Sequence, residues 1–260
     1  VWDLSVDELA AADWDLTPRR REKGGLEDLL VGVREALGNT GSVAPLSEVA
    51  QVMAGRAIKS PDLTDEPSGE RPVGYLRIKD LAQGRVGRSS SWLAPNIAEA
   101  ERRWSLLPGD VLLSKSGTIG KAALVRNGVS GSIASSGLYV LRVDQKRLDP
   151  GFLLAYLASP ACQNWLAARS RGANIQHLGR TVLDELPIPL PPLQMQARAA
   201  AQHKDFGTDA LTFLAQATGT GESGRLTAWL AELSSGVPDF VEALDSTPPL
   251  RLLEPLAALA

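Results

Sequence analysis

The sequence predicts an α+β protein built around one main domain, on the basis of two kinds of pattern. GDVLLS, KAALV and GLYVLRVD have the residue types of strands, and the turns SGTIG and NGVSGSIASSG separate them. DPGFLLAYLASPACQNWLAARS has apolar residues at helical spacing and is expected to form two helices. The mixture indicates an α+β domain, with flanking helices around a mixed or antiparallel sheet.

The first 42 residues are expected to form a helical linker ahead of the main domain. GLEDLLVGVREAL, at residues 25–37, has apolar residues at helical spacing. Its predicted apolar face consists of Leu26, Leu29, Leu30, Val33 and Leu37. Glycine, asparagine and serine at 38–42 then break the pattern. We therefore place the boundary near residue 43 and expect the main domain to occupy residues 43–190.

Three segments define the rest of the predicted organisation. PLSEVAQVMAG begins a new unit with Ser47 as a candidate helix cap, and VGYLRIKDL alternates like a strand that has Arg77 and Lys79 on one face. The prolines of LPIPLPPLQ are expected to end a strand before an alanine-rich helix at 191–217, which Gly207 weakens. Residues 218–260 begin with a flexible GTGESG linker and are expected to form a short helical tail.

The composition is that of a soluble globular protein, with 44% hydrophobic and 22% charged residues and no apolar run that approaches a bilayer span. Cys162 is the only cysteine and His177 and His203 are the only histidines, which excludes an internal disulfide framework and disfavours a zinc site. We expect a cytoplasmic protein without a membrane partner. The chain begins at Val1 with acidic residues and no methionine, which indicates a fragment rather than a secretory signal.

The net charge of −3 conceals a strongly basic middle. Residues 71–180 hold 16 Lys/Arg against 6 Asp/Glu, whereas residues 1–70 hold 7 against 14 and residues 181–260 hold 4 against 10. Salt screens the interaction between exposed charges that are more than about 10 Å apart, so the local field, rather than the net charge, decides affinity for phosphates. The middle can therefore form a polyanion site by itself. Alternatively, its basic residues solvate one surface and pair with the acidic flanks.

The turn KSGTIGKA resembles a nucleotide-binding loop but lacks two of the residues that such a loop needs. Aligned on Gly120 and Lys121, a Walker loop requires glycine at Lys115, for amides that wrap the phosphates, and a hydroxyl at Ala122, for magnesium. There is also no G-x-G-x-x-G loop, no G-x-S-x-G elbow and no histidine near Cys162 in the sequence. We therefore interpret KSGTIGKA as a connection between strands and predict no catalytic or metal-binding residues.

Three polar loops in the basic middle carry the residue types that contact DNA. Lysine and arginine neutralise phosphate oxygens, while arginine, asparagine and glutamine pair with base edges. The exposed amides of the GTIG turn can also accept a phosphate, as a backbone nest does. The candidate DNA-binding residues are Arg77, Lys79, Arg85 and Arg88 in the first loop, Lys115, Ser116, Thr118 and Lys121 in the second, and Arg171, Asn174, Gln176, His177 and Arg180 in the third. Arg85, Arg88, Asn174 and Gln176 are the candidates for base edges.

These segments resemble a known family. In order, GYLRIKDLAQGRV, LLPGDVLLSKSGTIGKAALV, GLYVLRVD, DPGFLLAYLASP and RGANIQHLGRTVLDELPIPLPPLQMQ are similar to the target recognition domain of type I restriction-modification specificity subunits. The similarity covers roughly residues 43–205 and departs at Met195, where the family usually has an acidic residue. It implies a recognition domain that reads one half of a bipartite DNA site and is followed by a helix.

The resemblance also implies partners. WDLSVDELAAADWDLTPRRR is similar to the segment that joins an N6-adenine DNA methyltransferase to its recognition domain. The implied partners are double-stranded DNA and a methyltransferase subunit or domain, with a restriction subunit as a further partner. No Asn/Asp-Pro-Pro-aromatic motif or glycine-rich S-adenosylmethionine loop occurs. We therefore expect no cofactor in this chain, no enzyme activity by itself, and S-adenosylmethionine in an attached or partner methyltransferase.

The residues leave open an alternative from another class, a protein-interaction scaffold that docks a partner through its helical ends without DNA recognition. In that case the basic middle serves only solubility. A nucleotide hydrolase is the least supported function, because KSGTIGKA lacks the residues that phosphate binding requires.

Overall fold

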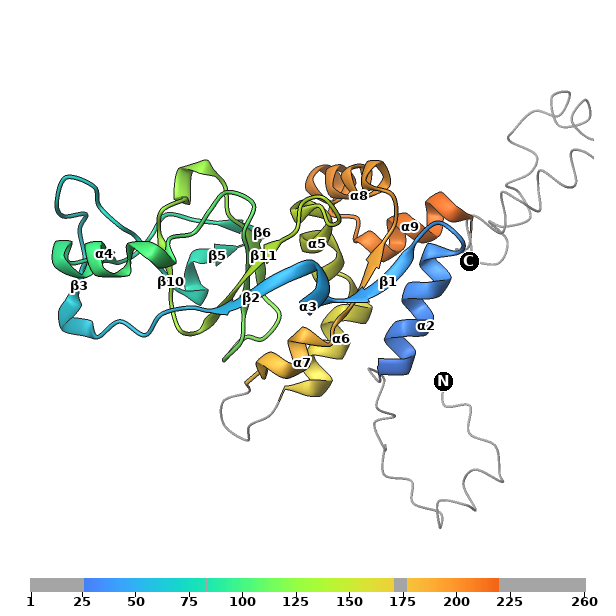
Figure 1. The fold of residues 1–260 in the computed structure, drawn as a ribbon, viewed down its shortest axis with the longest axis horizontal. Helices are drawn as coiled ribbons and strands as arrows, with labels where there is room; N and C mark the ends of the chain where they lie inside the picture. The colour runs from blue at the N-terminus through green and yellow to red at the C-terminus, as the bar shows by residue number, and fades with distance from the viewer. Residues whose placement is uncertain (1–25, 83, 171–176, 220–260) are drawn as a thin grey trace, which may run out of the picture.

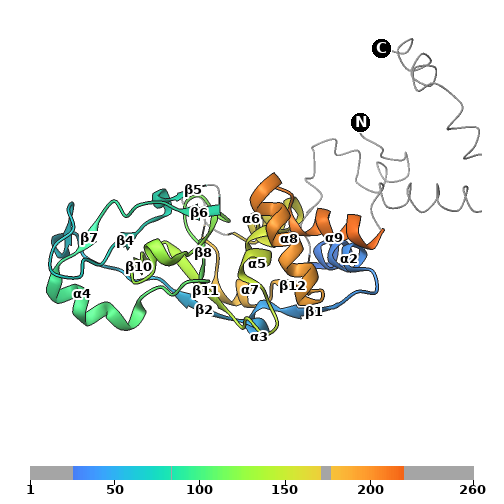
Figure 2. The same ribbon diagram turned by 90° about the horizontal axis from the view of Figure 1, so that it is seen from above.

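The structure, a computed structural model, describes residues 26–82, 84–170 and 177–219. A central sheet separates two unlike ends of the molecule. In Figure 1 the helices gather at the right, whereas small strands and helix α4 (Pro95–Glu101) lie at the left. The view from above shows the same division (Figure 2).

The central sheet has six strands in the order β2-β11-β8-β9-β6-β5. Only the pair β6 and β9 is parallel, and the four other neighbouring pairs are antiparallel. The predicted α+β class with a mixed sheet is therefore confirmed. The strands are β2 (Ala50–Ala54), β5 (Leu81–Ala82), β6 (Gly84–Val86), β8 (Val111–Ser114), β9 (Ala122–Leu124) and β11 (Leu138–Val143). Strands β8, β9 and β11 are the ones predicted from GDVLLS, KAALV and GLYVLRVD.

Three two-stranded ladders contain the other strands of the described residues. β1 (Ser42–Pro45) pairs antiparallel with β12 (Pro187–Leu190), β3 (Leu63–Thr64) pairs antiparallel with β7 (Trp92–Leu93), and β4 (Tyr75–Leu76) pairs parallel with β10 (Ile133–Ala134). Pro191 and Pro192 stand between the end of β12 and the helix that begins at Leu193, as predicted, whereas Pro187 and Pro189 lie inside β12. A two-stranded ladder tolerates them because each of its strands uses only one edge.

The stretch VGYLRIKDL is not one strand, contrary to the prediction. It contains β4, the 3-10 turn η2 (Ile78–Asp80) and β5. The carboxylate of Asp80 accepts the Arg77 N–H at 2.7 Å, and the Asp80 N–H donates to the Arg77 carbonyl at 2.9 Å. These two bonds close the turn and end the alternation after Leu76, so Arg77 and Lys79 do not share a strand face.

The helix predicted near Ser47 is short, and Ser47 does not cap it. Helix α3 (Leu46–Val49) follows Pro45, which occupies the N-cap position, so Ser47 lies inside the helix. The remaining 3-10 turns are η1 (Ser60–Asp62), η3 (Arg102–Trp104) and η4 (Asn127–Val129). Helix α7 (Arg180–Asp184) precedes β12.

The predicted helix pair is present as α5 (Pro150–Leu157) and α6 (Pro160–Arg169). Each begins at a proline that follows a capping side chain: Asp149 accepts the Phe152 N–H at 2.8 Å, and Ser159 accepts the Cys162 N–H at 3.3 Å. All residues of α5 from 152 to 157 are buried. Because α5 is apolar on every side, it packs between the sheet and the other helices.

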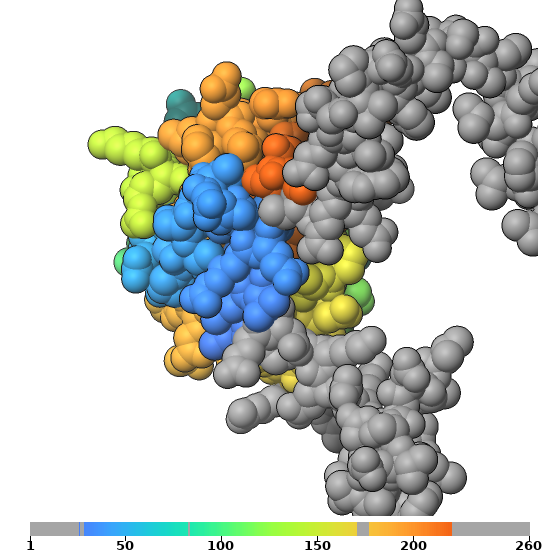
Figure 3. All heavy atoms as spheres, turned by 90° about the vertical axis from the view of Figure 1, so that its right-hand side faces the viewer, coloured from blue at the N-terminus to red at the C-terminus, as the bar shows by residue number. Residues whose placement is uncertain are grey.

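Helices from the two flanks of the domain pack together. Helix α2 (Leu26–Leu37) lies against α9 (Ala210–Thr218) and β12, and Figure 3 shows α2 and α9 side by side on the surface. On the predicted face of α2, Leu29, Val33 and Leu37 are buried, whereas Leu26 is exposed. Gly207, with φ of 72°, ends α8 (Leu193–Phe206) before α9 begins.

The sheet separates two apolar clusters because successive side chains of a strand point to opposite faces. Val111 and Leu113 of β8 face the helices, and Leu112 faces a second cluster on the other side. Strand β8 is therefore buried on both faces, which explains its unbroken apolar run.

Gln196, in the PLPPLQMQ stretch, connects α8 to the loop before α5. Its amide oxygen accepts the Asp149 N–H at 2.8 Å, and its amide nitrogen donates to the carbonyls of Arg147 at 3.0 Å and Pro191 at 2.8 Å. The Gln196 side chain is 1% exposed, so water has little access to these backbone groups and cannot readily replace its hydrogen bonds.

We predict that Gln196→Met lowers the free energy of unfolding by about 2–4 kcal/mol, because it leaves several buried polar groups unpaired. Urea denaturation measures the change. Gln194→Met, at an exposed position of the same helix, is the matched control and should change stability by less than about 0.5 kcal/mol. Equal effects of the two substitutions would contradict the proposed connection.

Candidate nucleic-acid interface

The turn between β8 and β9 is closed by the buried side chain of Ser114. The Ser114 hydroxyl accepts the Lys121 N–H at 2.8 Å and donates to the Thr118 carbonyl. The Gly120 N–H donates to the Ser114 carbonyl at 3.2 Å, and the Lys115 N–H donates to the Gly137 carbonyl at 2.9 Å. The amides of Lys115, Gly120 and Lys121 are therefore used within the fold and are not available to a phosphate.

The two lysines of this turn also have partners inside the protein. Lys121 Nζ donates to the Ile78 carbonyl at 3.2 Å, and Lys115 Nζ lies 4.9 Å from the centroid of the Tyr139 ring. Burial lowers the pKa of the Lys115 ammonium and raises the pKa of the Tyr139 hydroxyl. Both lysines are half-buried, and they position the turn.

Backbone contacts bring parts of all three predicted loops together. Ser116 and His177 form an isolated antiparallel bridge, and the Leu178 N–H donates to the Lys115 carbonyl at 2.8 Å. A Cβ on Gly137 would lie 3.0 Å from Ile78 Cδ1 and 3.3 Å from Ser116 Oγ. The turn at 77–80, the β8–β9 turn and the segment starting at His177 thus meet. We call this the loop surface, consisting of Arg77, Lys79, Ser116, Thr118 and His177.

Two cations of the loop surface border open space. Arg77 and Lys79 line a shallow pocket of about 450 Å³ together with Ile58, Tyr75, Ile78, Ser135 and Ser136, and none of these residues is acidic. The Arg77 guanidinium lies 5.6 Å from the Tyr75 ring centroid. Lys79 is exposed and has no ion pair or hydrogen bond within the described ranges. This pocket therefore presents positive charge that the described residues do not neutralise.

The other predicted residues are distributed elsewhere. Arg85 is exposed on β6, opposite Leu124 of β9, and Arg88 lines a separate groove with Arg71 and Arg102. The first predicted loop is therefore divided by the fold. Arg171, Asn174 and Gln176 lie outside the described residues.

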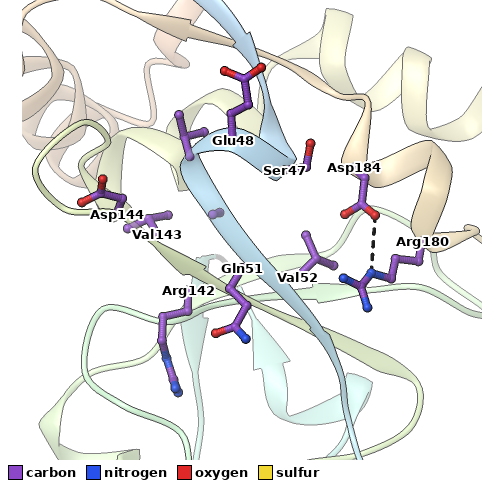
Figure 4. Close-up of a pocket in the computed structure, with 11 residues that line it drawn as sticks. Ser47, Glu48, Gln51, Val52, Arg142, Val143, Asp144, Arg180 and Asp184 are labelled. Carbon is purple, nitrogen blue, oxygen red and sulfur yellow. Dashed lines mark ion pairs between the residues drawn. The ribbon is translucent and has the colours of Figure 1, made fainter.

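Arg180 lies in a groove with mixed charges. This groove, of about 530 Å³, runs along β2, an edge strand of the sheet (Figure 4). Arg180 pairs with Asp184 at 3.4 Å, and Glu48 and Asp144 also line the groove. The carboxylates offset its positive charge, so it attracts a polyanion less strongly than the pocket beside Lys79.

An ion pair that sequence reasoning missed holds the start of β8. Asp110, 1% exposed, accepts the Leu107 N–H at 2.8 Å and two N–H groups of Arg142, each at 2.8 Å. The hydrogen bonds with Asp110 raise the pKa of Arg142. Arg142 is 32 residues away in the sequence, and only the pairing of β11 with β8 brings it close to Asp110.

Other kinds of site find little support in the described part of the chain. Its residues contain no cluster of three or more His, Cys, Asp or Glu side chains that could hold a metal ion. None of its helices is long and apolar enough to cross a membrane. Cys162 is fully buried, which raises the pKa of its thiol and makes it a poor nucleophile.

Residues 42–216 match the family described as Type I restriction modification DNA specificity domain. The match covers more than half of the chain, and the protein therefore belongs to this family. The recognition drawn from the sequence is confirmed, and membership favours DNA specificity over the scaffold alternative.

Two curated relatives are specificity subunits. The chain is 26% identical over 141 residues to a protein named as the type I restriction enzyme MjaX specificity subunit of Methanocaldococcus jannaschii, and the match covers 52% of this chain and 33% of the relative. It is 27% identical over 127 residues to the type I restriction enzyme EcoBI specificity subunit of Escherichia coli, with 48% and 26% covered. The chain thus spans a third or less of the length of these relatives.

Two solved structures can be compared with this chain. A chain from a structure on complex assembly and conformational transition of the type I R-M system has a TM-score of 0.50 and 20% identity, with 86% of this chain and 55% of that chain covered. The HsdS subunit from Thermoanaerobacter tengcongensis has a TM-score of 0.48 and 23% identity, with 65% and 42% covered. The first of these supports the fold.

We predict unequal effects of alanine at the two glycines of the β8–β9 turn. Gly117 has φ of 69° with open space around it. Gly117→Ala should therefore lower the free energy of unfolding only by the penalty for a left-handed backbone at alanine, about 1 kcal/mol. At Gly120, with φ of 83°, a Cβ would lie 2.6 Å from Gln163 Oε1. Gln163 would then lose its bonds to the carbonyls of Gly120 and Leu157.

We therefore expect Gly120→Ala to lower the free energy of unfolding by about 2–4 kcal/mol. Chemical denaturation of the two variants side by side gives the comparison. Equal losses would show that the Gln163 contact does not hold the turn.

Proposed function

We propose that residues 42–216 recognise a specific sequence in double-stranded DNA and thereby direct a methyltransferase to its site. The observation that carries this proposal is the convergence of three loops on the loop surface, in a chain that belongs to the DNA specificity domain family. Cations there that have no carboxylate partner suit phosphate oxygens, while a histidine and hydroxyls suit base edges or phosphates.

The roles of the loop-surface residues differ with their environment. Lys79 is exposed without a partner among the described residues, so it contacts a phosphate without breaking an internal bond. Lys115 and Lys121 hold the β8–β9 turn from within. His177 is exposed next to Ser116 and can donate or accept a hydrogen bond. Direct contacts thus come from Arg77, Lys79 and His177, and the turn lysines act by positioning.

The chain supplies recognition, and methyl transfer takes place on other residues. The proposed partner is an N6-adenine methyltransferase that holds S-adenosylmethionine, either fused ahead of Val1 or as a separate subunit. A restriction subunit is a further proposed partner, and the proposed location is the cytoplasm. The similarity of WDLSVDELAAADWDLTPRRR to a methyltransferase junction supports the fused arrangement.

We expect the full chain to enrich one sequence from a random pool of DNA duplexes at low salt. Gel-shift selection followed by sequencing tests this, and absence of any enriched sequence would overturn the proposed function. With the enriched duplex, a plot of log affinity against log salt should have a slope of about −0.9 for each phosphate contact.

Lys79→Gln should reduce the magnitude of this slope by about 0.9 and leave the enriched sequence unchanged. The matched control is Lys146→Gln, because Lys146 is also exposed but lies away from the loop surface. Lys146 follows the C-terminal end of β11, whereas Ser135 and Ser136, which line the pocket with Lys79, precede its N-terminal end. A slope that falls equally in both variants would assign the effect to net charge rather than to the loop surface.

A further inference from the structure

A second basic surface lies at the other end of the β4–β10 ladder from the loop surface. It is an open groove of about 540 Å³. Arg77 and Ser135 follow β4 and β10, whereas the groove contains residues 71–74 and 128–132, which lead into these strands. Arg88, Ser89, Trp92, Arg102 and Ser105, from the segment between β4 and β10, complete its lining. We call it the arginine groove; its charged and polar side chains are Arg71, Arg88, Arg102, Ser89, Ser105, Ser130 and Ser132.

The positive charge of the arginine groove is only weakly offset. None of the described residues that line it is acidic. Arg71 and Arg88 are exposed and have no ion pair or hydrogen bond in the part of the chain that the structure describes. Arg102 pairs with Glu99 at 2.7 Å, but both side chains are largely exposed, at 47% and 72%, and such surface pairs contribute little. All three guanidinium groups are therefore available to an anion.

The groove has a fixed backbone frame. Gly74 and Trp92 form an antiparallel bridge, and the Leu93 N–H donates to the Val73 carbonyl at 2.9 Å. On the opposite wall, the Gly131 N–H donates to the Leu106 carbonyl at 2.8 Å, and the Leu106 N–H donates to the Ser132 carbonyl at 2.9 Å. These contacts fix the backbone of lining residues 73, 74, 92, 131 and 132.

The hydroxyls and the indole of the groove add neutral polar contacts. A Cβ on Gly74 would lie 2.9 Å from Ser89 Oγ and 3.0 Å from Ser132 Oγ, so the two hydroxyls converge on one point of the floor. Ser89 Oγ donates to the Ser91 carbonyl at 2.6 Å. Trp92 is half-buried in the lining. Arginine and serine are residue types that contact nucleic-acid backbones.

We propose that the arginine groove binds the sugar-phosphate backbone of the DNA duplex whose bases the loop surface reads. This inference rests on the proposed function. The arginine fork matches two oxygens of a phosphate. Residues 73 and 77 flank β4 and are at most about 13 Å apart in extended backbone, close to the major-groove width of about 12 Å, so the spacing of the two surfaces is compatible with one duplex.

Backbone contacts position a protein on DNA without reading its sequence. Neutralising the groove should therefore weaken binding to every duplex and leave the preferred sequence unchanged. The variant is Arg71→Gln/Arg88→Gln/Arg102→Gln in the full chain. We expect the magnitude of the log–log salt slope to fall by about 1–3, and affinity to fall at least about tenfold at 0.1 M salt.

The matched control removes three positive charges elsewhere, as Arg34→Gln/Lys146→Gln/Lys204→Gln. Arg34, Lys146 and Lys204 are exposed on α2, on the loop after β11 and on α8, outside the groove. Thermal denaturation establishes that both variants fold. A groove variant whose slope and affinity equal those of the control overturns the proposal, and so does a change in the enriched sequence, because that would indicate base reading.

A third experiment distinguishes binding of a DNA backbone from binding of free phosphate. Inorganic phosphate is titrated into the wild-type chain and the groove variant by calorimetry. If phosphate alone binds in the groove while duplex affinity is the same in both proteins, the groove is a site for a free anion and the proposal fails. If the wild type binds duplexes through the groove but enriches no sequence, the groove assignment stands and the proposed reading function fails.

Discussion

The return of residues 177–196 across the domain is the constraint on which the rest of the structure depends. Buried hydroxyls hold this segment by its backbone: Tyr139 donates to the Leu178 carbonyl at 3.0 Å and Tyr156 donates to the Pro187 carbonyl at 2.6 Å. Pairing of β1 with β12 then closes the domain, and Gln196 attaches the following helix. Because buried backbone groups must find partners, this path places His177 against the β8–β9 turn.

The fold divides the basic middle of the chain into groups with different roles. Some cations are used internally, as Lys121 is on the Ile78 carbonyl and Arg142 is on Asp110. Arg56, which lies outside the basic middle, is likewise neutralised, since its guanidinium pairs with Glu101 at 2.6 Å. Arg77 and Lys79 line one open surface, the loop surface, without a carboxylate partner among the described residues. Arg71, Arg88 and Arg102 line the arginine groove, where Arg102 alone is paired, with the exposed Glu99. Electrostatic attraction for a polyanion therefore resides in a subset of the 16 basic residues between 71 and 180.

Sequence patterns predicted the long elements well and the short ones poorly. The six-residue strand β11 and the helices α5 and α6 have enough periodic residues to identify them. VGYLRIKDL alternates like a strand, yet the Asp80 carboxylate turns the backbone after Leu76. Charge counts located the basic middle, but they could not show which of its cations share a surface. Arg77 and Arg88 are close in the sequence, yet strand pairing places them on two different surfaces.

The sequence by itself determined the α+β class, the family resemblance, the basic middle and the failure of KSGTIGKA as a small-nucleotide loop. Those properties depend on residue identity and local spacing. Only the tertiary structure decided that the two lysines of this turn have internal partners, that Ser116 meets His177, and that Arg71 and Arg102 join Arg88 in one groove. The physical reason is that these contacts join residues far apart in the chain, whose proximity depends on strand register and on the path of the returning segment.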